Sequence, residues 1–111
     1  LEGYPPDFYD PVLDRISVSR TVDVGHLWLD GCDPVAYLKK ALPRTRVIHI
    51  HGIEDRDHRS AAKAPREKLK AVLDELVGSD YRGVLTIEVF SEADFLTSRA
   101  AIDAVMHANL R

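Results

Sequence analysis

Three short stretches of the chain carry the apolar patterns that predict β-strands. Residues 17–24 and 46–51 alternate between apolar and polar side chains, the period of two that separates the two faces of a strand. Residues 84–90 form an apolar run interrupted only by Thr86 and Glu88, as expected of a parallel strand buried between two layers. We therefore expect three strands, the last of them buried on both faces.

Helical signals fill the intervals between these strands. Asp33-Pro34 is a capping residue followed by proline at the first helical position, and Pro43 ends the helix that starts there. Residues 65–77 place apolar side chains at intervals of three and four, and Gly78 supplies a stop. Residues 91–94 resemble a capping box and begin the last helix.

The resulting order is β-α-β-α-β-α, which predicts an α/β fold with a parallel sheet and right-handed crossovers. A chain of 111 residues forms at most one domain, so residues 1–111 are assigned to a single domain. Three strands make part of an open sheet or an arc of a barrel. They cannot close an eight-stranded barrel, which takes about 200–250 residues.

Composition narrows the classes of function. Hydrophobic residues make up 45% of the chain, and the net charge of -3 gives no general attraction to nucleic acids or anionic membranes. No apolar run approaches the ~18–20 residues of a membrane span, and the first residues do not form a secretory signal. The single cysteine, Cys32, excludes an internal disulfide and favours a reducing cytoplasm.

Polar residues lie near the carboxyl end of each predicted strand: Asp23 on the first, His49 and His51 on the second, and Glu88 on the third. Taken alone, each is more often a structural residue than a ligand. Burial of an unpartnered carboxylate is costly, however, and parallel sheets place their sites at this end. The joint occurrence of Asp, His and Glu on three strands therefore favours a site for a divalent metal, with Zn²⁺ or Mn²⁺ the best matches.

The segment after the second strand, residues 52–59, is rich in charged side chains. By composition alone it is as consistent with a solvated surface loop as with a site, and its position directly after the histidine strand favours the site. Asp57 and His58 are suited to hold a further metal ion or to transfer a proton. Arg56 and Arg59 are suited to bind a phosphate group.

Three motifs resemble those of the xylose-isomerase-like, or AP-endonuclease-2, superfamily of TIM barrels. Residues 23–26 read Asp-Val-Gly-His and resemble the Asp-x-Gly-His motif at the end of the sixth barrel strand. Residues 46–52 and 83–88 resemble the seventh strand, with its metal-binding histidine, and the eighth strand, with its metal-binding glutamate. The resemblance implies that the chain is the C-terminal part, about strands 6–8, of such a barrel.

The fuller wording of these motifs, with His49-Ile50-His51-Gly52 and Glu88-Val89-Phe90-Ser91, most resembles the cobamide remodelling phosphodiesterase branch. That resemblance implies a cytoplasmic, metal-dependent hydrolase that cuts the phosphoester linkage of the nucleotide loop in cobalamin-type corrinoids. The expected products are a cobinamide-type compound and the α-riboside of the lower-ligand base. The expected partner is therefore a small-molecule phosphoester, with no nucleic acid and no membrane.

Residue roles follow from the same resemblance. The implied metal ligands are Asp23, His26, His49, Asp57, His58 and Glu88. His26 is implied either as a ligand of a second metal or as a substrate contact, and catalysis is assigned to Asp23, His26 and Glu88. Asp57 and His58 are adjacent, whereas the Asp-x-His pair of endonuclease IV would put Arg56 at the aspartate position. We expect the substrate to contact Trp28, His51, Arg56 and Arg59.

Two other interpretations remain open. One is a sugar or sugar-phosphate isomerase or epimerase of the same superfamily, in which one Mn²⁺-type ion polarises a ketose while carboxylates move a proton. The other is a non-catalytic half-barrel that pairs with itself or with an N-terminal half, because three strands alone leave two sheet edges exposed. Residues 1–5 resemble the tail of a fifth-strand motif whose glutamate would precede them.

Overall fold

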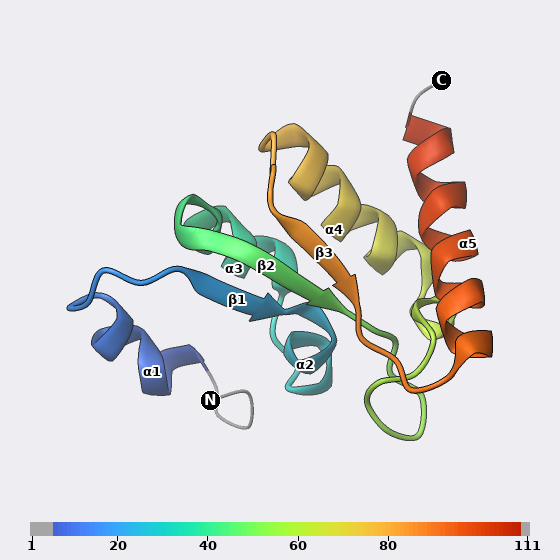
Figure 1. Cartoon of the computed structure of the whole chain (residues 1–111), viewed down its shortest axis with the longest axis horizontal. Helices are drawn as coiled ribbons and strands as arrows, with labels where there is room; N and C mark the ends of the chain where they lie inside the picture. Colours follow the sequence, from blue (N-terminus) through green and yellow to red (C-terminus); the bar gives the residue numbers. More distant parts are fainter. Residues whose placement is uncertain (1–5, 110–111) are drawn as a thin grey trace.

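The computed structural model describes residues 6–109, so the resemblance to a fifth-strand motif at residues 1–5 lies outside the described residues. Three parallel strands form one sheet in the order β1-β2-β3, with β1 at Arg20–Asp23, β2 at Thr45–Ile50 and β3 at Val84–Ile87 (Figure 1). The predicted α/β class and the parallel pairing are therefore confirmed.

Helices connect the strands and follow the last of them. The α-helices are α1 (Pro6–Leu13), α2 (Val24–Leu29), α3 (Pro34–Ala41), α4 (Arg66–Gly78) and α5 (Glu92–Asn109), and the short 3₁₀ helices are η1 (Leu42–Arg44) and η2 (Ala61–Lys63). No helix within residues 6–109 is both long enough and apolar enough to cross a membrane.

The capping residues predicted at two helix starts are confirmed by their hydrogen bonds. The Asp33 side chain accepts a hydrogen bond from the Val35 amide at 3.0 Å, and the Ser91 hydroxyl accepts one from the Asp94 amide at 3.1 Å. Each bond satisfies an amide that the first turn of a helix leaves unpaired. Helix α4 ends at Gly78, as its sequence indicates.

The first strand differs from its prediction at both ends. Residues 17–19 are not part of β1, and Val24 and Gly25, predicted as the end of a strand, instead begin α2. Asp23 is the N-cap of that helix, and its Oδ1 accepts a hydrogen bond from the His26 amide at 2.8 Å. The periodicity did not reveal α2 because six residues are too few to establish a helical period.

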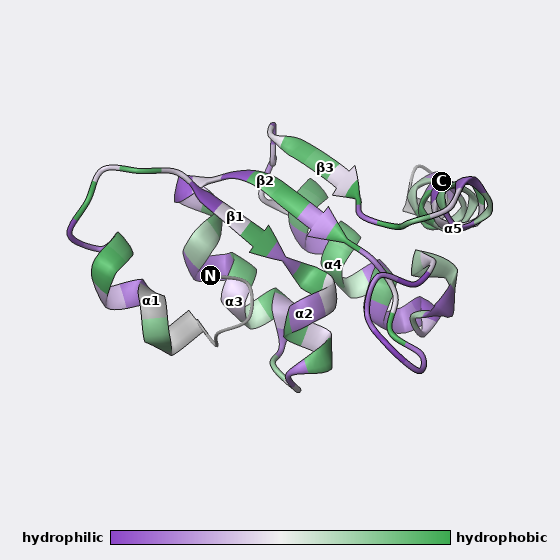
Figure 2. Ribbon diagram, turned by 60° about the horizontal axis from the view of Figure 1, so that its bottom comes forward, coloured by the Kyte–Doolittle hydropathy of each residue, from purple (hydrophilic) through white to green (hydrophobic). Residues whose placement is uncertain are grey.

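One face of the sheet packs on helices and forms the core. Val22, Ile48 and Ile50 are almost completely buried there, and α3 and α4 lie against this face (Figure 2). The apolar stripe predicted on α4 is confirmed, because its four members are all buried: Leu69, Val72, Leu73 and Leu76. The alternate residues of the strands, including Asp23 and His49, therefore point to the opposite face.

The expectation that the third strand is buried on both faces is wrong. Val84 is 57% exposed, Phe90 is 72% exposed, and Leu85 and Ile87 are only partly buried. The physical reason is position: β3 is the edge of the sheet, and within residues 6–109 no second layer covers its outward face. An apolar run indicates a strand, but its burial depends on which neighbours the fold supplies.

Candidate metal centre

The strand register brings the predicted polar residues to one end of the sheet. Asp23 and His49 are direct partners in the pairing of β1 with β2, so their side chains share a face. Glu88 follows β3 directly, and its amide donates to the Ile50 carbonyl at 3.0 Å. The carboxyl ends of parallel strands thus bring together two carboxylates and a histidine, whose ligand atoms all lie within 4.8 Å of one another.

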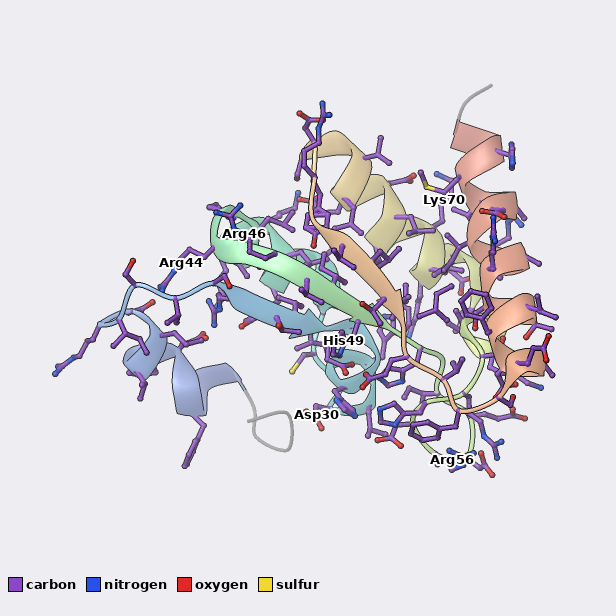
Figure 3. The ribbon with its side chains drawn as sticks, in the orientation of Figure 1. Asp30, Arg44, Arg46, His49, Arg56 and Lys70 are labelled. Carbon is purple, nitrogen blue, oxygen red and sulfur yellow. The ribbon has the colours of Figure 1, made fainter. Side chains whose placement is uncertain are left out.

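Helix α2 adds His26 to this cluster. The Nδ1 atom of His26 lies 3.1 Å from Asp23 Oδ2, and the Nδ1 atom of His49 lies 3.8 Å from the same oxygen. His49 Nδ1 also lies 3.1 Å from Glu88 Oε2. Figure 3 labels His49 at the carboxyl end of β2, whereas Arg44 and Arg46 lie near its other end. Asp23 Oδ2 therefore lies near an imidazole nitrogen of His26 and one of His49.

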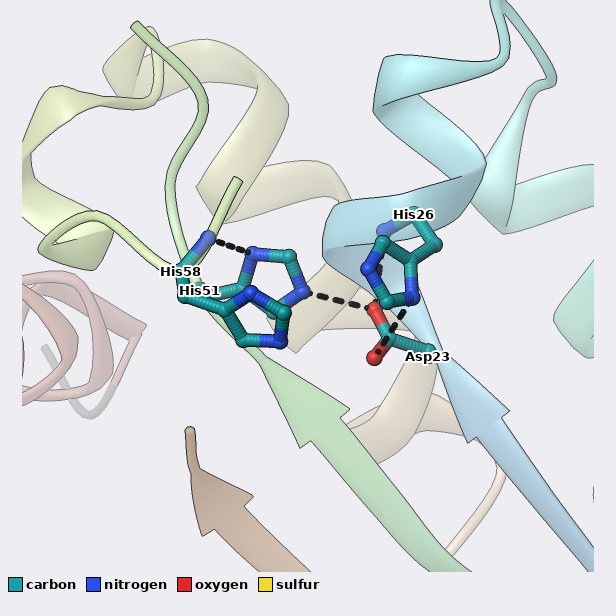
Figure 4. A group of neighbouring side chains, drawn as sticks. All are labelled: Asp23, His26, His51 and His58. Atoms are coloured by element: carbon teal, nitrogen blue, oxygen red, sulfur yellow. Dashed lines mark hydrogen bonds and ion pairs between the residues drawn. The ribbon is translucent and has the colours of Figure 1, made fainter. Parts of the chain in front are cut away.

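A second group of ligand atoms shares Asp23 with the first. It consists of Asp23, His26, His51 and His58, whose ligand atoms also lie within 4.8 Å of one another (Figure 4). The rings of His51 and His58 are stacked with centroids 4.4 Å apart, and the His26 ring meets both rings edge-on. Phe90 stacks on the outer side of His58 at 4.9 Å. Sequence reasoning did not single out Phe90, which had only its aromatic character as a signal.

The hydrogen bonding shows that the cluster can accept a cation. Asp23 Oδ2, His26 Nδ1 and Glu88 Oε2 are buried and take part in no hydrogen bond among the described residues. Buried polar atoms are normally satisfied, so three such atoms on Asp23 and its neighbours need an explanation. The ion pairs of Asp23 and Glu88 within residues 6–109 are all with histidines. This donor set is able to hold a metal ion.

The Asp23 carboxylate remains ionised in this setting. Burial raises its pKa, but hydrogen bonds from His51 and from the His26 amide, together with the charges of both histidines, outweigh burial and lower the pKa below the ordinary 3.8. The opposite balance holds for His51, where burial lowers the pKa but the bond to Asp23 and its charge raise it above 6.5. The bond between the two residues therefore favours the ionised form of the Asp23 carboxyl and the protonated form of His51.

The loop after β2 is closed at its base and tied to α5. Gly52 and Arg59 exchange two backbone hydrogen bonds, at 2.7 and 3.1 Å. Beyond this base, the Ser60 hydroxyl lies 2.7 Å from the Thr97 hydroxyl, and the Ser98 hydroxyl accepts from the amide of Ala61 at 2.8 Å. These contacts anchor the base of the segment that carries Asp57 and His58, and His58 lies in the second ligand group.

Within that loop, Asp57 and His58 take different positions. His58 belongs to the second ligand group, and its backbone lies in the left-handed region, with φ at 57°. Asp57 is absent from both ligand groups among the described residues. Its two carboxylate oxygens instead lie 3.0 Å from His26 Nε2 and 3.0 Å from His58 Nδ1. The contacts of Asp57 thus fit a residue that orients two histidines.

The residues predicted to contact substrate are spread over several places. Arg59 is bound by Asp55 through two bonds of 2.8 and 2.7 Å, while Arg56 is exposed in the same loop (Figure 3). Trp28 lines a separate pocket with Cys32, Val35 and residues of α4. His51 is completely buried among the described residues, and its predicted contact with a substrate stays a prediction.

Comparison with known protein families, with curated proteins and with solved structures finds no significant match to this chain. The class of site is therefore defined by its geometry: a parallel α/β sheet with an Asp, His and Glu cluster able to hold a metal ion at the carboxyl ends of its strands.

Proposed function

We propose that this chain forms part of a metal-dependent hydrolase that acts on phosphate esters. The observation that carries the proposal is the group of Asp23, His49 and Glu88, whose ligand atoms lie within 4.8 Å of one another. In this group Asp23 Oδ2 and Glu88 Oε2 are buried and without hydrogen bonds in the described chain. The parallel order β1-β2-β3 and the location of the cluster at the strand ends support an arc of a xylose-isomerase-like barrel, with β1 to β3 as its sixth to eighth strands.

In this proposal the metal is held by Asp23, His26, His49 and Glu88. A donor set of two nitrogens and two oxygens suits Zn²⁺ or Mn²⁺, which accept both kinds of ligand. When bound, such an ion supplies Lewis-acid chemistry that polarises a phosphoryl oxygen and makes water a better nucleophile at neutral pH. His58, a member of the second ligand group, is suited to hold a further ion or to transfer a proton.

The chain's own residues supply orientation and charge. Asp57 accepts from the Nε2 side of His26, which leaves His26 Nδ1 turned toward Asp23, the carboxylate-to-imidazole arrangement that fixes a ligand histidine. The exposed guanidinium of Arg56 lies on the loop that borders the cluster and is placed to meet a phosphate. Arg59 is held by Asp55 and contributes to the structure of the loop.

For the substrate we propose the nucleotide-loop phosphoester of cobamides. Support for this narrower step comes from the motifs at residues 23–28, 49–52 and 88–91, which resemble the cobamide remodelling branch. The cytoplasm is the compartment proposed for this activity. The cluster itself supports metal-assisted chemistry on a phosphate ester. The choice of cobamides as the substrate rests on the motif resemblance alone.

The test measures metal content first and turnover second. The chain is purified, stripped of metal and dialysed against Zn²⁺ or Mn²⁺, and we expect tight stoichiometric binding that is lost in Glu88→Gln. The control is Glu67→Gln, an exposed glutamate on α4, which should bind as wild type does. The loaded chain, alone or within any longer polypeptide that contains it, is then assayed for cobinamide-type product from a cobalamin-type corrinoid.

Two results would overturn the proposal. Equal metal binding by Glu88→Gln and wild type would remove the site. Turnover of ketoses, with no hydrolysis of phosphoesters, would assign the same metal centre to an isomerase or epimerase.

The open face of the sheet supports a second candidate, a non-catalytic half-barrel that needs a partner. Val84 is exposed on the edge strand, and no element within residues 6–109 covers the face on which Asp23 and His49 lie. Exposed strand edges associate readily. Light scattering of the isolated chain distinguishes the candidates, because a half-barrel should form dimers, and a metal-loaded monomer would contradict it.

A further inference from the structure

His51 occupies an unusual position next to the metal centre. Its side chain is completely buried, and both of its ring nitrogens are engaged by the protein. The Nδ1 atom accepts a hydrogen bond from the His58 amide at 2.9 Å, and the Nε2 atom lies 2.8 Å from Asp23 Oδ1 (Figure 4). A residue with these contacts does not reach a substrate in solvent.

The two contacts determine where the proton of the neutral ring lies. A backbone amide can only donate, so Nδ1 of His51 must be the acceptor and Nε2 must carry the hydrogen. Nε2–H therefore donates to Asp23 Oδ1, which also accepts from the His26 amide at 2.8 Å. With two donors on Oδ1, the carboxylate is held with Oδ2 toward His26 and His49.

Gly25 supplies the space for this arrangement. A Cβ atom at this position would overlap Cε1, Nδ1 and Nε2 of the His51 ring, so any larger residue must displace the ring. Gly25 lies within α2, where glycine is ordinarily less favourable than alanine. Its presence in the helix is therefore explained by the close approach of His51.

We propose that His51 is a positioning residue that holds Asp23 with one oxygen toward the metal, and that Gly25 exists to admit its ring. This inference rests on the proposed metal centre and deepens it. Asp23 is the one residue common to both ligand groups, so its orientation affects both. The role is distinct from that of a ligand, because both nitrogens of His51 are already used by the chain.

The first test reads the ring directly and needs no metal. Imidazole nitrogen NMR of the metal-free chain at mildly alkaline pH should show His51 as the Nε2–H form, with a proton that exchanges slowly. Exposed His107 serves as the internal control and should exchange rapidly. An Nδ1–H form of His51, or rapid exchange between the two forms, would overturn the proposal.

The second test uses two variants, each of which replaces only one of the two ring nitrogens of His51. The amide nitrogen of His51→Gln can reach the Nε2 position and donate to Asp23, whereas His51→Asn reaches only the Nδ1 position. We expect His51→Gln to keep Zn²⁺ affinity close to that of wild type and His51→Asn to lose about 10–100-fold, the usual cost of removing a partner of a ligand. Equal affinities for the two variants, at equal folded fraction, would contradict the proposal.

This design separates two kinds of failure. If wild type binds Zn²⁺ and Glu88→Gln does not, the metal centre is supported. The Zn²⁺ affinities of the two His51 variants then test the positioning role alone. If wild type binds no metal, the proposed function fails, while the NMR test still decides whether His51 orients Asp23.

The third test exploits Gly25. Gly25→Ala should lower both the stability and the Zn²⁺ affinity of wild type, since the new methyl displaces the His51 ring. In a His51→Ala background the same substitution should be neutral or stabilising, because alanine then only favours the helix. Urea unfolding and Zn²⁺ titration of the four proteins measure this reversal of sign. The same loss in both backgrounds would show that Gly25 serves another purpose.

Discussion

Polar side chains are buried at both ends of β1, but the two ends are built from different chemistry. At the amino end, the Arg20 guanidinium bonds with the Asp10 carboxylate and donates to the Tyr37 hydroxyl at 2.7 Å. At the carboxyl end, Asp23 meets histidines. At the amino end, the fixed positive charge of Arg20 thus balances the Asp10 carboxylate. At the carboxyl end, the groups that face the Asp23 carboxylate are titratable imidazole rings.

This contrast distinguishes a structural cluster of polar residues from a candidate site. A buried ion pair with hydrogen bonds is complete, and its removal affects the fold. The cluster around Asp23 leaves Asp23 Oδ2 and Glu88 Oε2 without hydrogen bonds in the described chain, so it has capacity for one more positive group. We therefore expect changes at Arg20 to alter stability and changes at Asp23 to alter metal binding.

The largest effect is expected from Asp23→Asn. Removing a charged ligand should cost more than the ~10–100-fold loss typical of its supporting groups, so we expect about a 1,000-fold loss of Zn²⁺ affinity by calorimetric titration. Asparagine is an equally good N-cap, so α2 should remain folded. Exposed Asp30→Asn is the matched control. A similar affinity in both variants would erase the distinction between the ends of β1.

The next effect concerns the other end. Arg20→Met should lower the free energy of unfolding by about 3 kcal/mol, because Asp10 loses its closest cationic partner in a largely buried pair and keeps only Lys40, at 3.7 Å, as a second cation. Urea unfolding followed by circular dichroism measures this change. Zn²⁺ affinity at equal folded fraction should stay as in wild type, and a parallel loss of metal binding would show that the two clusters act as one.

A smaller effect is expected for Tyr37→Phe. The variant removes the hydrogen bond that the hydroxyl accepts from Arg20 and the longer one that it donates to Asp10 at 3.4 Å, and it keeps the ring beneath the guanidinium. Unfolding should become easier by about 1 kcal/mol. The urea midpoint reports the change. A loss as large as that of Arg20→Met would mean that the hydroxyl, and not the ion pair, holds this end together.

The smallest effect is a dependence of stability on pH in the metal-free chain. The raised pKa of His51 contributes stability fully below 6.5, and that contribution is lost as pH rises through the folded value. The lowered pKa of Asp23 contributes above 3.8 and is lost as pH falls through its folded value. The pair should thus stabilise the chain most between these limits, as measured by urea unfolding across pH.

Metal should reverse the upper part of this profile. Ligand histidines bind metal only when neutral, so Zn²⁺ affinity should rise with pH across the range where the metal-free chain loses stability. His51→Gln should remove the decline above 6.5, whereas exposed His107→Gln should not. A metal-free chain that grows more stable above this pH would contradict the assignment.

Much of the fold could be predicted from the sequence because its signals are local. The apolar spacing along α4, the capping residues Asp33 and Ser91 and the strand at β2 each depend on neighbours within a few residues. The short α2 could not be recognised by period, although Asp23 followed three residues later by His26 offered an N-cap signal. The exposure of β3 could not be predicted, because it depends on the rest of the sheet.

The candidate site divides in the same way. The donors follow from the sequence alone, since Asp23, His49 and Glu88 stand at the carboxyl ends of strands that any parallel sheet brings together. The contacts of the residues around them depend on the three-dimensional fold. In the fold His51 is the buried hydrogen-bond partner of Asp23, and Asp57 contacts two histidines. These contacts join residues about 30 positions apart through a folded loop, and no local pattern encodes such a distance.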